Sequence, residues 1–193
     1  MELNSTLLFA RTFLKEPKML GSVIPSSRFL IHRLLRHMDF DRARVVVEFG
    51  PGVGNITNAL LRRMRPDSNL VAIETNADLA EHLNSSMDDR RLRTVVGSAE
   101  RVQETLASLG LPGADYIISG IPFSTMPTTV RDTILRNSYD ALVPGGEMII
   151  YQFSGAVLHH LRKLFPNVEQ EMEPLNVLPA KVFLAQKPAA SVA

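Results

Sequence analysis

Val45-Val46-Val47-Glu48-Phe49-Gly50-Pro51-Gly52-Val53-Gly54-Asn55 is the stretch that decides the fold. A short apolar run leads into three glycines, and residues 55–64 then show the apolar spacing of a helix. This order predicts a buried strand, a tight turn and a helix. Glycines let the backbone approach a ligand closely, and the first turn of a helix offers unpaired N–H groups. We therefore expect a nucleotide-binding site at this turn.

Beyond this turn, short apolar runs alternate with segments of helical spacing, which is typical of parallel βαβ units. We predict strands at 45–47, 70–73, 94–96, 115–118, 147–153, 168–178 and 180–186, and helices at 55–64, 77–84, 101–109, 128–142 and 156–165. Pro144-Gly145-Gly146 is predicted to form a tight turn before the fifth strand. Only Pro179 separates the last two strands, so they must be antiparallel, because a parallel crossover needs about a dozen residues or more.

The predicted fold class is therefore α/β: a Rossmann-like, mostly parallel seven-stranded sheet with a C-terminal antiparallel hairpin and an N-terminal helical extension. The length of 193 residues fits one such domain. We assign residues 45–187 to it, residues 1–44 to an extension that covers the site, and residues 188–193 to a frayed tail. The absence of cysteine excludes a disulfide framework and suits a cytoplasmic protein.

The extension at residues 1–44 is basic and has helical patterns. Residues 4–14 resemble a short amphipathic helix, and a second helix should begin near Pro25-Ser26-Ser27, where a serine can cap it. The basic side chains of this second helix are expected to face outward. Eight basic and four acidic residues give residues 1–44 a charge of +4, against −3 for the rest. Such a surface suits nucleic acid or an anionic membrane, and charge alone does not decide between them.

Two carboxylates accompany the glycine turn. Glu74 ends the second strand, 20 residues past Gly54, where it can accept hydrogen bonds from ribose hydroxyls. Enzymes that bind NAD share this feature. However, the spacing Gly50-x-Gly52-x-Gly54 departs from the dinucleotide pattern, and Glu48 would repel a pyrophosphate. Glu48 can instead pair with an ammonium group, directly or through water. Both features favour S-adenosylmethionine (SAM), whose methionine part carries an ammonium.

The segment 45–55 resembles motif I of class I SAM-dependent methyltransferases, and Val71-Ala72-Ile73-Glu74 resembles motif II. The resemblance covers roughly residues 45–186. It implies SAM as the cofactor, S-adenosylhomocysteine as its product, and no metal. Ser98 stands where the family frequently has Asp, so backbone atoms or Glu100 are the alternatives for the adenine contact. The implied cofactor-binding residues are Glu48, Gly50, Gly52, Gly54, Glu74, Thr75, Ser98, Ala99, Glu100 and Ser119.

At the end of the fourth strand, Ser119-Gly120-Ile121-Pro122-Phe123 is similar to the segment with which related enzymes hold an amine. Those enzymes carry Asn or Asp, then Pro-Pro or Leu-Pro, then an aromatic residue. Ser119 replaces the amide here, so the bidentate grip on an adenine amine is missing. This argues against an rRNA adenine methyltransferase, which stays open as the alternative.

Residues 13–27, together with 119–123 and Tyr151-Gln152-Phe153, resemble the small bacterial phospholipid N-methyltransferases. The resemblance implies stepwise methylation of phosphatidylethanolamine towards phosphatidylcholine at the inner face of the cell membrane. An anionic phospholipid surface is then the expected partner, and no nucleic acid is expected. The implied substrate contacts are Ser22, Ile24, Pro25, Ser26, Ile121, Pro122, Phe123 and Tyr151. The implied membrane-docking residues are Leu7, Leu8, Phe9, Arg11, Phe13, Lys15 and Lys18.

Methyl transfer to an amine needs a free nitrogen lone pair, whereas an ethanolamine ammonium is protonated at neutral pH. Tyr151 is the first candidate for contacting the amine, assisted by Ser119 and the Gly120 carbonyl, with water as a proton acceptor. The alternative for Tyr151 is an ordinary core tyrosine. A SAM-binding membrane or scaffold module without turnover also stays open.

Overall fold

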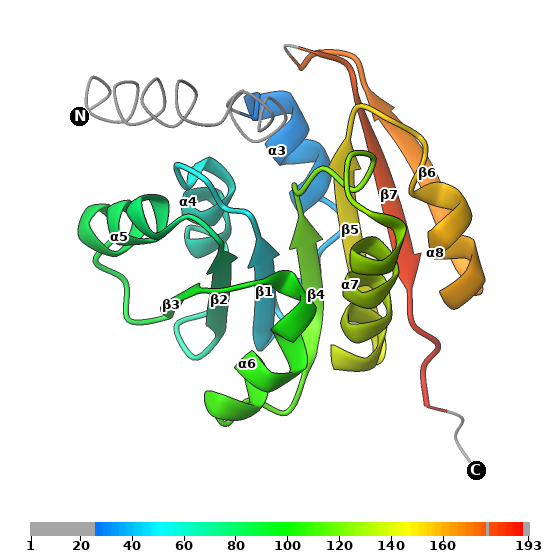
Figure 1. Cartoon of the computed structure of the whole chain (residues 1–193). Coiled ribbons are helices and arrows are strands. Elements are labelled where there is room, and N and C mark those ends of the chain that lie inside the picture. Colours follow the sequence, from blue (N-terminus) through cyan, green and yellow to red (C-terminus); the bar gives the residue numbers. More distant parts are fainter. Residues whose placement is uncertain (1–25, 177, 191–193) are drawn as a thin grey trace.

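The structure, a computed structural model, describes residues 26–176 and 178–190. A seven-stranded sheet runs through it in the order β3-β2-β1-β4-β5-β7-β6 (Figure 1). The strands are β1 (Val45–Phe49), β2 (Asn69–Glu74), β3 (Leu92–Val96), β4 (Ala114–Ser119), β5 (Leu142–Gln152), β6 (Asn167–Glu173) and β7 (Ala180–Gln186). The helical elements are α3 (Arg28–Leu35), α4 (Asn55–Leu61), α5 (Ala77–Ser86), η2 (Ala99–Arg101), α6 (Val102–Ser108), α7 (Thr128–Ala141) and α8 (Leu158–Leu164).

The first five strands pair in parallel, and β7 lies antiparallel to both β5 and β6. The predicted Rossmann-like sheet with its C-terminal hairpin is confirmed. The chain moves outward from β1 in one direction through β2 and β3, and then returns to place β4 on the other side of β1. Ligands of such sheets bind beyond the carboxyl ends of the strands at this switch point.

Helices cover both faces of the sheet (Figure 1), and an apolar layer on each face holds them in place. Val47 and Ile117 belong to the layer beneath α6, α7 and α8, whereas Val46 and Ile118 belong to the layer beneath α3 and α4. Successive strand residues point to opposite faces, so each strand supplies both layers. All five residues of β1 are buried, as expected of a central parallel strand covered on both faces.

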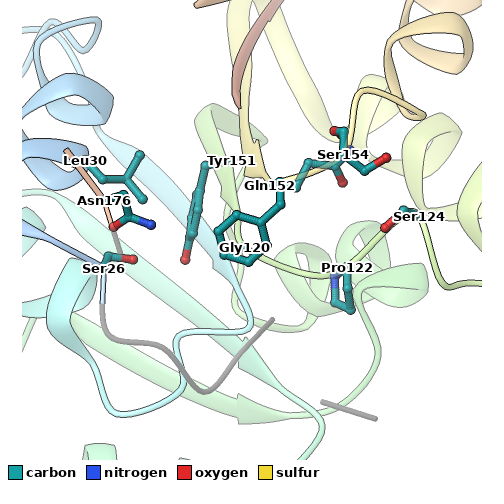
Figure 2. Close-up of a pocket in the computed structure, with 10 residues that line it drawn as sticks. Ser26, Leu30, Gly120, Pro122, Ser124, Tyr151, Gln152, Ser154 and Asn176 are labelled. Atoms are coloured by element: carbon teal, nitrogen blue, oxygen red, sulfur yellow. Dashed lines mark hydrogen bonds between the residues drawn. The ribbon is translucent and has the colours of Figure 1, made fainter. Parts of the chain in front are cut away.

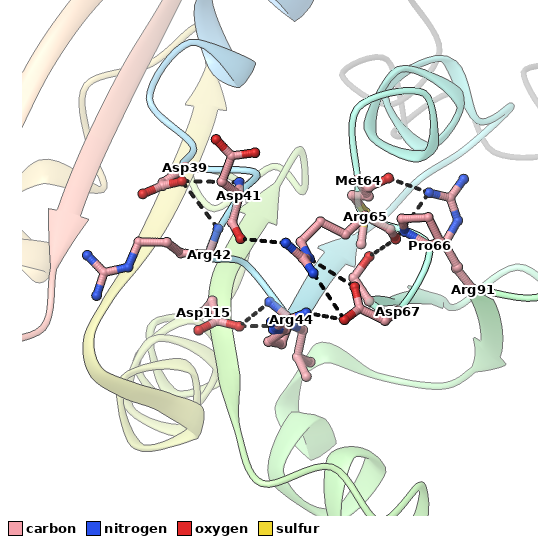
Figure 3. Close-up of polar contacts among 12 residues, drawn as sticks. Asp39, Asp41, Arg42, Arg44, Met64, Arg65, Pro66, Asp67, Arg91 and Asp115 are labelled. Atoms are coloured by element: carbon pink, nitrogen blue, oxygen red, sulfur yellow. Dashed lines mark hydrogen bonds and ion pairs between the residues drawn. The ribbon is translucent and has the colours of Figure 1, made fainter.

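Polar contacts tie the strands together at their amino ends, the edge opposite the glycine turn (Figure 3). A carboxylate oxygen of Asp115 accepts hydrogen bonds from the backbone N–H groups of Arg44 and Val45, each at 2.8 Å. The guanidinium of Arg91 donates to the carbonyl oxygens of Leu61, the last residue of α4, and of Met64 in the turn that follows, both at 2.6 Å. These bonds satisfy carbonyls that the helix leaves unpaired and fix α4 on the sheet.

The predicted turn at residues 144–146 is wrong, because β5 begins at Leu142 and continues through it. A register shift between Ala114 and Tyr116 accommodates the extra residues. The carbonyl oxygen of Ala114 lies 3.0 Å from the position of a side chain at Gly146, so only a glycine lets the strands pair this closely. The predicted strand at 168–178 is also too long, since β6 ends at Glu173.

The helix α3 begins where predicted, with Ser27 as its cap: the Ser27 hydroxyl oxygen accepts the N–H of Leu30 at 3.2 Å. Its apolar side is buried. The prediction that its basic side faces outward is wrong for Arg33, whose side chain is only 23% exposed, and holds for Arg36, which is 45% exposed. Arg33 donates to Glu173 at 2.7 Å and to Glu171 at 3.0 Å, and Arg36 pairs with Glu171. The stripe therefore binds the β6 edge of the sheet.

Several predictions lie outside the described residues. These are the amphipathic helix at 4–14, the substrate contacts Ser22, Ile24 and Pro25, and all seven membrane-docking residues. Within residues 26–176 and 178–190, every helix is too short or too polar to span a membrane.

Candidate active site

The turn after β1 has the conformation that its glycines suggested. Gly50, Gly52 and Gly54 have φ values of 65°, 57° and 86°, in the left-handed region that side chains disfavour. A side chain at Gly54 would also overlap with Leu83 and Met87 of the α5 segment. The glycines thus fix a tight passage from β1 into α4 and leave the backbone open to a ligand.

Glu74 is bonded directly to this turn. Its Oε2 accepts the N–H of Gly52 at 3.2 Å, and its Oε1 accepts the N–H of Asn76 at 3.0 Å. The side chain is only 4% exposed, so these bonds set its orientation. Oε1 also accepts the Thr75 hydroxyl at 3.4 Å, whereas Oε2 has a second lone pair that is free for a hydroxyl donor. Glu74 therefore fits the ribose contact expected of it.

Glu48 lies beneath the turn and is 2% exposed. Its Oε2 accepts a hydrogen bond from the Thr57 hydroxyl at 2.7 Å. Burial raises the pKa of Glu48 to about 7, the negative charge of Glu74 adds to this, and the Thr57 hydrogen bond opposes it. No lysine, arginine or histidine of the described residues pairs with Glu48. A ligand ammonium would supply the missing counter-charge, so Glu48 and Glu74 together fit SAM.

On the adenine side, the Ser98 hydroxyl is used in hydrogen bonds within the protein. The Ser98 hydroxyl donates to Glu100 Oε2 at 3.1 Å and accepts the Glu100 N–H at 3.2 Å, so it caps η2. Ala99 is buried beside it. Sequence reasoning missed Val96, which pairs with Glu74 in the sheet and is 59% exposed. An exposed valine beside the ribose carboxylate offers an apolar surface for a base.

A pocket opens next to the glycine turn (Figure 2), and its empty space, together with the open solvent at its mouth, is about 550 Å³. It lies where the loops after β4 and β5 meet the start of α3 and the hairpin loop. Its lining residues are Ser26, Leu30, Gly120, Pro122, Ser124, Tyr151, Gln152, Phe153, Ser154 and Asn176. None of these side chains is charged. Of the predicted residues, the pocket brings together Ser26, Gly120, Pro122 and Tyr151.

The hydroxyl of Tyr151 fills the space that a side chain at Gly120 would need. A side chain at position 120 would coincide with the hydroxyl of Tyr151 and touch its ring. Burial raises the pKa of Tyr151, the charge of Glu48 adds to this, and a hydrogen bond with Ser26 opposes it. The hydroxyl therefore stays protonated at neutral pH. It can accept a hydrogen bond from a ligand, but it does not act as a phenolate base.

The structure places three of the predicted contacts outside the lining of this pocket. Ser119 is fully buried, does not line the pocket, and its hydroxyl has no hydrogen-bond partner among the described residues. Phe123 is likewise fully buried in the core beneath α6 to α8. Ile121 covers the glycine turn, with its Cγ2 atom 2.9 Å from where a side chain at Gly50 would begin. The strand therefore presents Gly120, rather than Ser119, at the pocket surface.

Sequence reasoning missed the polar residues on the other walls. Gln152 lies next to Tyr151, and its Nε2 donates to the Ser154 carbonyl at 2.6 Å. Asn176 accepts the N–H of Ser27 at 3.0 Å and so joins the hairpin loop to the start of α3. Gln152 could have been found from its place at the strand end. No local sequence pattern indicates Asn176, because its hydrogen-bond partner Ser27 is 149 residues away in the chain.

The strand order, the glycine turn and the two carboxylates define a class I SAM-dependent methyltransferase. NodS, an N-methyltransferase from Bradyrhizobium japonicum, has a similar fold, with a TM-score of 0.65 and 14% identity over 82% of this chain and 92% of NodS. The 1,6-didemethyltoxoflavin-N1-methyltransferase of Burkholderia thailandensis, solved with S-adenosylhomocysteine, gives 0.63 and 19% over 83% of this chain and 77% of that enzyme.

Residues 21–174 match the family model of the methyltransferase small domain, and the chain belongs to that family. It is also 29% identical over 181 residues to the ornithine lipid N-methyltransferase of Singulisphaera acidiphila, which spans 93% of this chain and 94% of the relative. The predicted class and its cofactor, SAM, are confirmed.

Proposed function

We propose that this chain methylates the amine of a membrane-lipid head group. Phosphatidylethanolamine and its mono- and dimethyl derivatives are the proposed acceptors, leading to phosphatidylcholine. The observation that carries the proposal is the close approach of the Tyr151 hydroxyl to Gly120 in an uncharged pocket beside the cofactor turn. The similarity to a relative named as a lipid N-methyltransferase supports lipid amines as the acceptor class.

SAM supplies a methyl group on a sulfonium centre. The residues of the chain hold the acceptor nitrogen in line with it. The Tyr151 hydroxyl oxygen and the Gly120 carbonyl accept hydrogen bonds from the amine N–H groups and leave its lone pair free. Because the raised pKa of Tyr151 keeps its hydroxyl protonated, the amine proton leaves to water at the pocket mouth.

The same pair argues against a planar base as the acceptor. Related enzymes that grip an adenine amine use an amide side chain after the fourth strand. Here that place is taken by Ser119, whose hydroxyl is buried away from the pocket, and the Tyr151 hydroxyl fills the space beside Gly120. An aliphatic amine needs less room and approaches from the pocket mouth. We further propose that residues 1–25 hold the enzyme on an anionic membrane at its cytoplasmic face.

Ornithine lipid is the second acceptor to consider, because the relative from Singulisphaera acidiphila carries that name. Both lipids present a primary amine close to an anionic group, a phosphate in one and a carboxylate in the other. The pocket accepts the amine in the same way in both cases.

The test uses the purified full chain with methyl-labelled SAM and three acceptors in parallel: vesicles containing phosphatidylethanolamine, vesicles containing ornithine lipid, and unmodified rRNA. We expect label in phosphatidylethanolamine, and at least a tenfold lower rate for Tyr151→Phe. Label in ornithine lipid alone would move the assignment to that lipid. Label only in rRNA, or in none of the three, would contradict lipid methylation.

A further inference from the structure

The lining of the pocket has no positive charge to pair with the anionic group of the proposed head group. A lipid head group of the proposed kind carries an anion beside its amine, whereas every lining side chain is neutral. Burying an anion without a counter-charge or hydrogen-bond donors is costly. A cation close to the pocket wall is therefore required, and it must lie away from Tyr151, where the amine binds.

Lys181 meets this requirement. It pairs with Gln152 in the sheet, and its Nζ lies 3.1 Å from where a side chain at Gly155 would begin. Gly155 directly follows Ser154, which lines the pocket. The glycine thus leaves room for the ammonium at the pocket wall. Among residues 26–176 and 178–190, no carboxylate lies within 4.0 Å of this ammonium, so its charge is not neutralised.

Ser154 lines the pocket and directly precedes Gly155, beside which this ammonium lies. Its hydroxyl oxygen accepts the N–H of Ala156 at 3.2 Å, and its hydroxyl proton has no acceptor among the described residues. Figure 2 shows Ser154 and Ser124 on one side of the pocket, and Tyr151 with Ser26 on the other. The pocket therefore has an acceptor end for an amine and a donor end for an anion.

We propose that Lys181 and Ser154 form the subsite for the anionic group of the lipid head group. This inference rests on the proposed function and adds a requirement to it, namely that the acceptor must carry an anion beside its amine. A lysine ammonium is a point charge that suits either a phosphate or a carboxylate.

The test compares acceptors with and without the anion in neutral detergent micelles. Phosphatidylethanolamine and ornithine lipid carry it, and a long-chain alkyl ether of ethanolamine keeps the amine but lacks it. Lys181→Met should raise KM for an anionic acceptor about tenfold, with kcat within about twofold, and should leave the ether unaffected. The acceptor that responds identifies the anion as phosphate or carboxylate.

Matched variants separate charge from folding. Lys181→Arg should restore most of the affinity, and Lys163→Met, on the exposed side of α8, should have no effect. If Lys181→Met does not fold, as judged by thermal melting and SAM binding, Ser154→Ala provides the second test and should raise KM for the anionic acceptor only. An equal loss for all acceptors, or no loss, would overturn the subsite. A wild-type chain that methylates no amine lipid would overturn the proposed function together with it.

Discussion

At the scale of single residues, we expect Glu48 to couple cofactor binding to pH. Its pKa of about 7 in the ligand-free protein means that it is largely protonated below neutrality. A bound ammonium favours the carboxylate, so binding lowers this pKa and releases a proton. Affinity for SAM should therefore rise with pH, by up to about tenfold per unit below pH 7, and level off above it.

Calorimetry between pH 5.5 and 8 checks this prediction. Glu48→Gln should bind SAM more weakly and lose most of the pH dependence. Glu147→Gln is the matched control, because burial raises the pKa of Glu147 to about 7 as well. Glu147 lies on β5 four positions before Tyr151, away from the strand end that meets the pocket, so this variant should keep the pH dependence. A flat affinity profile for the wild type would contradict the assignment of Glu48.

Gly120 and Tyr151 give a second prediction at this scale. Gly120→Ala places a methyl group where the Tyr151 hydroxyl lies, so kcat/KM should fall at least tenfold while SAM affinity changes little. Tyr151→Leu frees that space but removes the hydroxyl. Steady-state kinetics of both single variants and the double variant form a cycle. If the losses simply add, the two side chains do not compete for one volume.

At the scale of elements, ion pairs with the β6–β7 hairpin hold α3 in place beside the pocket. Arg33→Met would leave Glu173, a buried carboxylate, without its cation. We expect a loss of about 2 kcal/mol in the free energy of unfolding and a raised KM, because Ser26 and Leu30 line the pocket. Urea unfolding and kinetics measure the two effects. Arg101→Met, in an exposed pair with Glu104, should change neither.

The order of the elements could be predicted because each strand and helix has its own local pattern. The hairpin followed from the short connection at Pro179, and the cofactor turn from glycines close together in sequence. The predicted turn at 144–146 was wrong because two glycines can also form an irregularity within a strand. Only the register between β4 and β5 distinguishes a turn from such an irregularity. Local patterns thus predict elements better than they predict how elements pair.

The acceptor pocket was less predictable for the same reason. Ser119 pairs with Ile150, and this register brings Gly120 beneath Tyr151, a residue 31 positions later. The sequence indicated both residues as acceptor contacts, but it did not indicate that the Tyr151 hydroxyl would fill the space beside Gly120. Asn176 and Lys181 contribute through long-range contacts with α3 and the β5 loop, and no local pattern indicates them.

At the scale of the whole molecule, the proposed function needs the site to meet a membrane. The sequence of residues 1–14 combines apolar residues with Arg11, and residues 1–44 carry a charge of +4. Deleting residues 1–14 should lower binding to anionic vesicles at least tenfold in a flotation assay, while SAM affinity stays within about twofold. Unchanged flotation of the truncated chain would assign membrane contact to another part of the protein.

The central claim is that the methyl group is transferred to a head-group nitrogen. Its most direct test is mass spectrometry of lipids after the full chain has reacted with SAM carrying a deuterated methyl group. We expect the ethanolamine head-group fragment of phosphatidylethanolamine to gain one or more deuterated methyl groups. Unchanged head-group fragments in every amine lipid offered, with deuterium found instead in rRNA adenosine, would contradict it.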